Sequence, residues 1–108
     1  MSRETVHIKS PAESELMRES GRLLAKVFKH LDSFVKEDVT TMAINNEVER
    51  YIRQELNARP ASLGQYDYPY SLNTSVNEVV CHGMPSAHYA LRPRDIINLD
   101  ITLEKNGF

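Results

Sequence analysis

The stretch DIINLDITLEKNGF, residues 95–108, decides the fold because it holds the clearest strand in the chain and the clearest turn. Apolar and polar residues alternate along it, which is typical of a strand with one buried face. The pair Asn106-Gly107 that follows predicts a tight hairpin turn, and so favours an antiparallel sheet. One face carries Ile97, Leu99, Ile101 and Leu103, and the other carries Asn98, Asp100, Thr102 and Glu104.

Two amphipathic helices are predicted before this strand. SPAE, residues 10–13, has the residues of a capping box with proline at the first helical position, and apolar residues recur behind it to about Val35. Thr40 or Thr41 can cap a second helix, which should fray before Pro60. Its apolar stripe consists of Ile44, Val48, Tyr51, Ile52 and Leu56.

The remaining segments connect these elements. Residues 1–9 are predicted to be an arm or a short edge strand, and residues 61–73 a structured loop. TSVNEVV, residues 74–80, favours a strand that ends before a break at CHGMP. Consecutive strands usually pair, so this strand should lie beside the one through Asp100. The predicted fold class is α+β, with two helices followed by a small antiparallel sheet.

Composition narrows the class of protein. The 108 residues suit one domain or part of one, with 41% hydrophobic and 26% charged residues. A net charge of −2 without a basic stripe argues against nucleic acid or an anionic membrane as partner. No apolar run resembles a membrane helix or a signal peptide, so the cytoplasm is the expected compartment. The single Cys81 excludes an internal disulfide.

Two residues are candidates for chemistry. His82 follows a predicted strand and precedes Gly83, which would let the backbone turn sharply; it could transfer protons, or simply bond a neighbouring carbonyl. Asp100 is an acid in an otherwise apolar strand, which indicates either a cation or metal beside it or a solvated sheet face.

The other candidates have simpler interpretations. Cys81 beside His82 is expected to be a small buried side chain, because adjacent residues on an extended chain point to opposite faces. His7, His30 and His88 lack ligand spacing and are expected at the surface. Tyr66, Tyr68 and Tyr70 could line a pocket or cover the sheet.

These residues resemble a known family. SVNEVVCHGMP, residues 75–85, followed by residues 92–108, resembles the N-terminal half of a bacterial-type (type I) methionine aminopeptidase. Residues 13–28 and 61–71 resemble the first helix and the loop of that family. The resemblance implies half of a pita-bread fold, so that residues 1–108 form a single partial domain. It also implies an exopeptidase that removes the initiator methionine from nascent polypeptides. The resemblance implies that such an enzyme uses two divalent metal ions, such as Co, Mn, Fe or Zn.

The resemblance also implies roles for individual residues. His82 matches the histidine that contacts the scissile peptide, and Asp100 matches the first metal-ligating aspartate. Tyr68 matches a wall of the methionine pocket, while the carbonyls of Asn77 and Val79 match a monovalent cation site.

The sequence departs from the family at three positions around that pocket. Ser62 and Asn73 stand where the family usually has cysteine, and Gln65 where it has tyrosine. Polar groups buried without partners would weaken the fit of a thioether, so the preference for methionine should be lower.

The metal ligands that the family requires suggest two functional hypotheses. The family's second metal aspartate, a histidine and two glutamates would follow Phe108, and one carboxylate cannot hold two metals. The chain is therefore expected either to be an inactive half of a metallo-aminopeptidase, or to be a non-catalytic module that binds another protein or itself as a homodimer.

Overall fold

The first helix begins at the predicted capping box. The structure is a computed structural model that describes residues 5–108, and α1 (Pro11–Phe34) is its first element. Ser10 Oγ accepts the N–H of Glu13 at 3.1 Å, and the Glu13 carboxylate accepts the N–H of Ser10 at 3.0 Å. Residues 5–10 are exposed and form no strand, while residues 1–4 lie outside the described part. The prediction of the helix is confirmed, and within residues 5–9 the first segment is an arm.

The second helix is capped by Thr40, the first of the two threonines considered. Thr40 Oγ1 accepts the N–H of Ala43 at 3.0 Å, and α2 (Thr41–Arg50) follows. Its last turn is wider, the π-helical segment η1 (Tyr51–Glu55), which ends before Pro60 as predicted. Thr41 instead bonds the loop at Ser86, where its hydroxyl accepts an N–H at 2.8 Å.

The strands form two small antiparallel pairs rather than one sheet ladder. β2 (Leu72–Val76) pairs with β3 (Ile97–Ile101), and β1 (Arg59–Pro60) pairs with β4 (Leu103–Glu104). The predicted strand over residues 95–104 is therefore split at Thr102, which separates β3 from β4. The short 3-10 helix η2 (Gln65–Asp67) lies in the loop between β1 and β2.

β2 differs from the predicted strand over residues 74–80. It begins two residues earlier and stops at Val76, because Asn77 turns the chain with φ +53°. Asn77 is held in that turn by Asp95, whose carboxylate accepts the Asn77 amide at 2.9 Å. β2 therefore ends earlier than predicted because of a tertiary contact, since Asp95 is far from Asn77 in the sequence.

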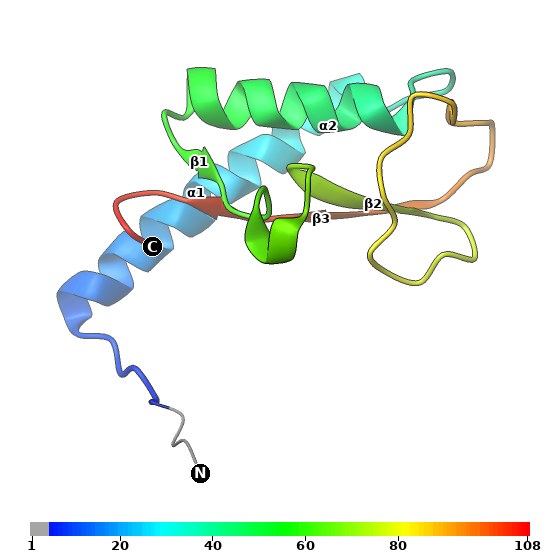
Figure 1. Cartoon of the computed structure of the whole chain (residues 1–108). Coiled ribbons are helices and arrows are strands. Elements are labelled where there is room, and N and C mark those ends of the chain that lie inside the picture. The colour runs from blue at the N-terminus through cyan, green and yellow to red at the C-terminus, as the bar shows by residue number, and fades with distance from the viewer. Residues whose placement is uncertain (1–4) are drawn as a thin grey trace, which may run out of the picture.

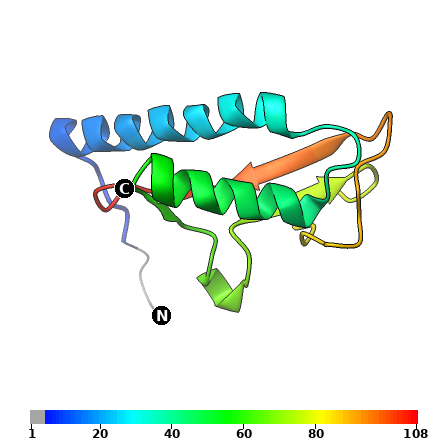
Figure 2. The ribbon, with the colours of Figure 1, turned by 90° about the horizontal axis from the view of Figure 1, so that it is seen from above.

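The helices cover one side of the strands. α2 lies over the strands in Figure 1, and the view from above places β3 between α1 and α2 (Figure 2). The core contains the predicted apolar stripe of α2 and, from Leu23 onward, that of α1, and it joins them to alternate residues of β3. Leu16 and Met17, near the start of α1, are exposed although the apolar spacing placed them in the same stripe. The buried hydrophobic residues of this core are Leu23, Val27, Leu31, Ile44, Val48, Ile52, Leu56, Leu72, Leu91 and Ile101.

His30 corrects the expectation of a surface histidine. It is half-buried between the helices, where its ring stacks on Tyr51 at 4.4 Å between centroids. Its Nε2 lies 3.1 Å from the Glu47 carboxylate. His7 and His88 are exposed, as predicted. Among residues 5–108, no helix has the length and apolar character needed to span a membrane.

Candidate functional site

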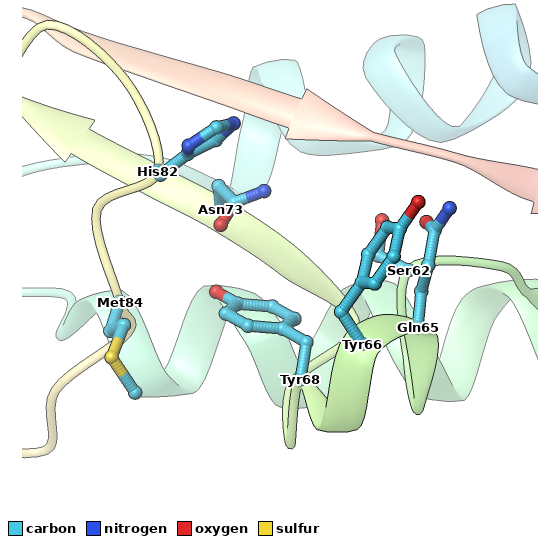
Figure 3. Close-up of a pocket in the computed structure, with 7 residues that line it drawn as sticks. All are labelled: Ser62, Gln65, Tyr66, Tyr68, Asn73, His82 and Met84. Atoms are coloured by element: carbon cyan, nitrogen blue, oxygen red, sulfur yellow. The ribbon is translucent and has the colours of Figure 1, made fainter.

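A hollow of about 510 Å³ gathers side chains from three separated parts of the chain. Figure 3 shows His82 beside Asn73 of β2, with Tyr68 facing them from the loop before β2. The seven lining residues are Ser62, Gln65, Tyr66, Tyr68, Asn73, His82 and Met84. Five of them had been matched to a role in the family. His82 was matched to the catalytic histidine, and the other four to the pocket for the methionine side chain, namely Ser62, Gln65, Tyr68 and Asn73. The fold brings these five together.

The loop that carries His82 is fixed against the outer edge of β2. The N–H of Thr74 donates to the carbonyl of Gly83 at 2.7 Å, and the N–H of Gly83 donates to Ser75 Oγ at 3.0 Å. A Cβ at Gly83 would lie 2.0 Å from the Thr74 carbonyl oxygen, so only glycine fits there. The sharp turn itself is at His82, with φ +57°, and not at Gly83 as predicted. Glycine is required for the close approach, and the histidine takes the left-handed conformation.

Tyr68 forms a rigid wall of the hollow. Its hydroxyl donates to the carbonyl of Leu72 at 2.9 Å, and its ring meets Tyr70 edge to face at 5.7 Å. Burial raises the pKa of Tyr68 above its ordinary value, and the nearby Tyr70 adds to this. Since the hydroxyl is engaged with the backbone, Tyr68 presents its ring rather than a free polar group. Tyr66, by contrast, is almost fully exposed at the rim.

The rest of the lining is polar. Ser62 is buried and its Oγ lies 2.6 Å from Thr102 Oγ1, so its hydrogen-bonding capacity is partly used within the chain. Asn73 is half-buried and Gln65 is exposed, and neither side-chain amide has a hydrogen-bond partner within residues 5–108. These two amides are therefore free to meet a bound molecule.

Asp100 lies next to the hollow without lining it. It pairs in register with Asn73, so the two side chains leave the sheet on the same face. Asp100 is exposed, which agrees with the interpretation of a solvated sheet face, although the same position is open to a cation. Residues 5–108 contain no group of three or more His, Cys, Asp or Glu side chains that could hold a metal ion. Asp100 can thus supply one carboxylate and not a complete site.

Asn77 and Val79 lie on the other side of β2, in the turn that ends it. They border a second hollow of about 270 Å³ together with Thr74. Thr74 is buried and its hydroxyl has no hydrogen-bond partner within the described residues. This turn thus borders a different hollow from the one that holds His82, although Met84 lines both.

Asp95 organises that turn and was not singled out from the sequence. Its carboxylate accepts the Asn77 amide, the N–H of Arg92 at 2.9 Å and the hydroxyl of Tyr89 at 2.8 Å. The Arg92 N–H is the largest cause that lowers the pKa of Asp95, and the Asn77 and Tyr89 bonds lower it further. The signal in the sequence was an acid directly before an apolar strand, which is a common place for a turn-stabilising side chain.

Two further residues differ from their sequence interpretation. Cys81 is exposed and not buried, because it lies in the loop after β2, where residues 77–82 are all exposed. Met84 lines the hollow with half of its surface exposed, although nothing in the sequence distinguished it from a core methionine. Its position follows from the Thr74–Gly83 hydrogen bond, which a sequence pattern does not show.

Comparison with known proteins decides the family. The sequence profile of metallopeptidase family M24 matches residues 15–108. The chain belongs to metallopeptidase family M24. This M24 chain is 42% identical over 103 residues to the methionine aminopeptidase of Escherichia coli K12, covering 95% of the chain and 39% of that protein. It is 38% identical over 105 residues to methionine aminopeptidase A of Synechocystis, covering 97% of the chain and 41% of that protein.

Solved structures agree with the sequence relatives. The crystal structure of methionine aminopeptidase from Rickettsia prowazekii superposes with a TM-score of 0.86 at 35% identity, over 92% of this chain and 39% of that one. The Thermotoga maritima methionine aminopeptidase gives 0.82 at 29% identity, over 90% and 39%. The predicted resemblance to type I methionine aminopeptidases is confirmed, as is the α+β half of a pita-bread fold. The M24 chain spans about two fifths of the length of these relatives.

Proposed function

We propose that the hollow around Asn73 and His82 is the substrate pocket of a methionine-aminopeptidase-type exopeptidase, to which this chain contributes one wall. The observation that supports it is the gathering of Ser62, Gln65, Tyr68, Asn73 and His82 around one hollow from three separate segments of the chain. In this proposal the first side chain of a peptide lies against the Tyr68 ring. His82, at the mouth, contacts the scissile peptide group and assists proton transfer.

Asp100 is proposed as one ligand of the metal centre. It lies on the face that carries Asn73, so a metal bound there would be beside the scissile bond of a peptide in the hollow. Two divalent metals need several ligands, and the described residues supply no group of three. Residues 5–108 therefore do not fit a dinuclear site by themselves, and we propose that this chain alone is inactive.

The backbone around Asn77 and Val79 is proposed to bind a monovalent cation. The Asp95 carboxylate accepts the Asn77 side-chain amide, and Asn77 and Val79 are both exposed. Among residues 5–108, no backbone hydrogen bond outside the helices and strands ends on either carbonyl. The role of such an ion would be structural, because this turn precedes the loop that positions His82.

The substrates we propose are the N-termini of nascent polypeptides in the cytoplasm. The free amides of Asn73 and Gln65 make the pocket more polar than a thioether requires, so we expect only weak selection for methionine. An exposed, unpaired Cys81 suits a reducing compartment. No observation on the described residues favours nucleic acid or a membrane as partner.

Binding in the hollow can be tested without catalysis. L-methioninamide, which has a free α-amino group and the methionine side chain, would be titrated into the isotope-labelled chain, with glycinamide as the control. We expect saturable NMR shift changes at Tyr68, Asn73 and His82 with methioninamide only. Equal responses to both amides, or shift changes confined to other parts of the chain, would contradict the proposal.

A further inference from the structure

Two side-chain amides face the hollow from two different elements. Asn73 comes from β2 and Gln65 from η2, and both line the hollow. In Figure 3 the two amides lie on the same side of the Tyr68 ring, Asn73 towards His82 and Gln65 towards Ser62. Neither amide has a hydrogen-bond partner among the described residues, so each keeps its donors and its acceptor for a ligand.

The backbone holds both amides in place. The N–H of Gln65 donates to the Ser62 carbonyl at 3.2 Å, and the Gln65 carbonyl accepts the N–H of Tyr68 at 2.9 Å. Asn73 lies within the ladder of β2 and β3, opposite Asp100. A ligand that meets these groups therefore does not have to order the main chain, which keeps the entropic cost of binding low.

Tyr68 gives the hollow an apolar wall. Its hydroxyl donates to the Leu72 carbonyl at 2.9 Å, so the ring is what Tyr68 offers to a ligand. The aliphatic stem of a side chain can pack against such a ring. None of the seven lining residues is an acid, a lysine or an arginine, so a charged end group would lose water without gaining a counter-ion. The hollow thus favours a neutral side chain with an apolar stem and a hydrogen-bonding end.

We propose that the hollow selects a first residue whose side chain has the length of methionine but ends in a neutral amide, as glutamine does. This proposal rests on the exopeptidase function proposed above, and it concerns the wall that this chain contributes. The stem of glutamine lies against the Tyr68 ring, and its amide exchanges hydrogen bonds with Asn73, the more buried of the two amides. An amide donates and accepts, whereas a thioether is only a weak acceptor, so methionine leaves the Asn73 amide less satisfied.

Two amino-acid amides test this selection. L-Glutaminamide and L-methioninamide would be titrated separately into the isotope-labelled chain and followed by NMR. We expect both to shift the resonances of Tyr68, Asn73 and His82, with a dissociation constant at least about threefold lower for L-glutaminamide, as one net hydrogen bond provides. The matched control is L-isoglutamine, the α-amide of glutamic acid, which has nearly the same shape but carries a charged carboxylate at the end of its side chain. It should bind more weakly than L-glutaminamide.

Asn73→Cys separates selection from folding, because the same variant is measured with both ligands. It should lower the preference for L-glutaminamide over L-methioninamide, expressed as the ratio of the two affinities, by at least about threefold. Asn98→Ser, on β3 and outside the hollow, should keep the ratio of the unaltered chain.

This proposal and the exopeptidase proposal fail in different ways. If L-methioninamide binds in the hollow as tightly as L-glutaminamide, or more tightly, the selection for an amide is overturned while the exopeptidase proposal stands. An unchanged ratio in Asn73→Cys would overturn the selection as well. If neither amide shifts the resonances of Tyr68, Asn73 and His82, the hollow is not a substrate pocket, and both proposals fail.

Discussion

Asn73 of β2 lies directly opposite Asp100 of β3, and this pairing connects the hollow to the candidate metal carboxylate. Asn73 lines the hollow beside His82, while Asp100 emerges on the same face one strand away. A ligand in the hollow would therefore have His82 on one side and Asp100 on the other. The Thr74–Gly83 hydrogen bond fixes this arrangement, since it holds the His82 loop against the strand that carries Asn73.

Gly83→Ala should destabilise the chain because the added methyl group cannot avoid the Thr74 carbonyl. Forcing such a contact typically costs about 1–3 kcal/mol. Gly21→Ala is the matched control, because a Cβ at this helical position meets no atom within 4 Å. It should raise the free energy of unfolding by about 0.5–1 kcal/mol. Urea unfolding measures both, and equal effects of the two substitutions would show that the close approach at Gly83 does not exist.

Local signals were enough to predict the helices. Ser10, Pro11 and Glu13 form their capping box within four consecutive residues, so the start of α1 depends on nothing distant. The alternation along residues 97–103 likewise predicts which side of β3 is buried.

The end of β2 and the position of His82 depend on contacts between distant segments. β2 ends at Val76 because the Asp95 carboxylate accepts a hydrogen bond from the Asn77 side chain. The chain turns at His82 because Gly83 is hydrogen-bonded to Thr74 of β2. The members of the hollow come from three segments, so only the resemblance to the family, and no spacing rule, could group them. Cys81 was predicted wrongly for the same reason, since it lies in the exposed loop that begins where β2 ends.

Acid should destabilise the turn around Asp95 only when the pH falls below the ordinary pKa of an aspartate. Its folded pKa is lowered from 3.8, so its contribution to stability is present above that value. The contribution is lost as the pH falls through the lower folded pKa. Carboxyl-carbon NMR should give a midpoint below 3.8 for Asp95. Asn77→Ala should move the midpoint upward by removing one donor, and a midpoint that does not respond would refute this account of the network.

Asn73→Cys should improve the binding of L-methioninamide in the hollow. The substitution removes a half-buried amide whose hydrogen-bonding groups the thioether of the ligand cannot satisfy. We take the binding free energy gained as about 1 kcal/mol, or roughly a fivefold gain in affinity. Asn98→Ser is the control, because Asn98 lies on β3 and does not line the hollow. Titration followed by NMR gives both affinities. A weaker affinity in Asn73→Cys would mean that the amide contributes to binding the ligand rather than opposing it.

The isolated chain should show no metal-dependent aminopeptidase activity on Met-Gly peptides with Co(II), Mn(II) or Fe(II). Asp100 offers one exposed carboxylate, and residues 5–108 contain no group of three metal-binding side chains. A single carboxylate in water binds a divalent ion weakly, so calorimetry should detect no binding at micromolar concentrations. Asp32→Ala, an exposed acid on α1, is the control for non-specific effects. Turnover by pure protein that disappears in Asp100→Ala and persists in Asp32→Ala would disprove the inactivity, and it would show that further ligands assemble around Asp100, for example from a second copy.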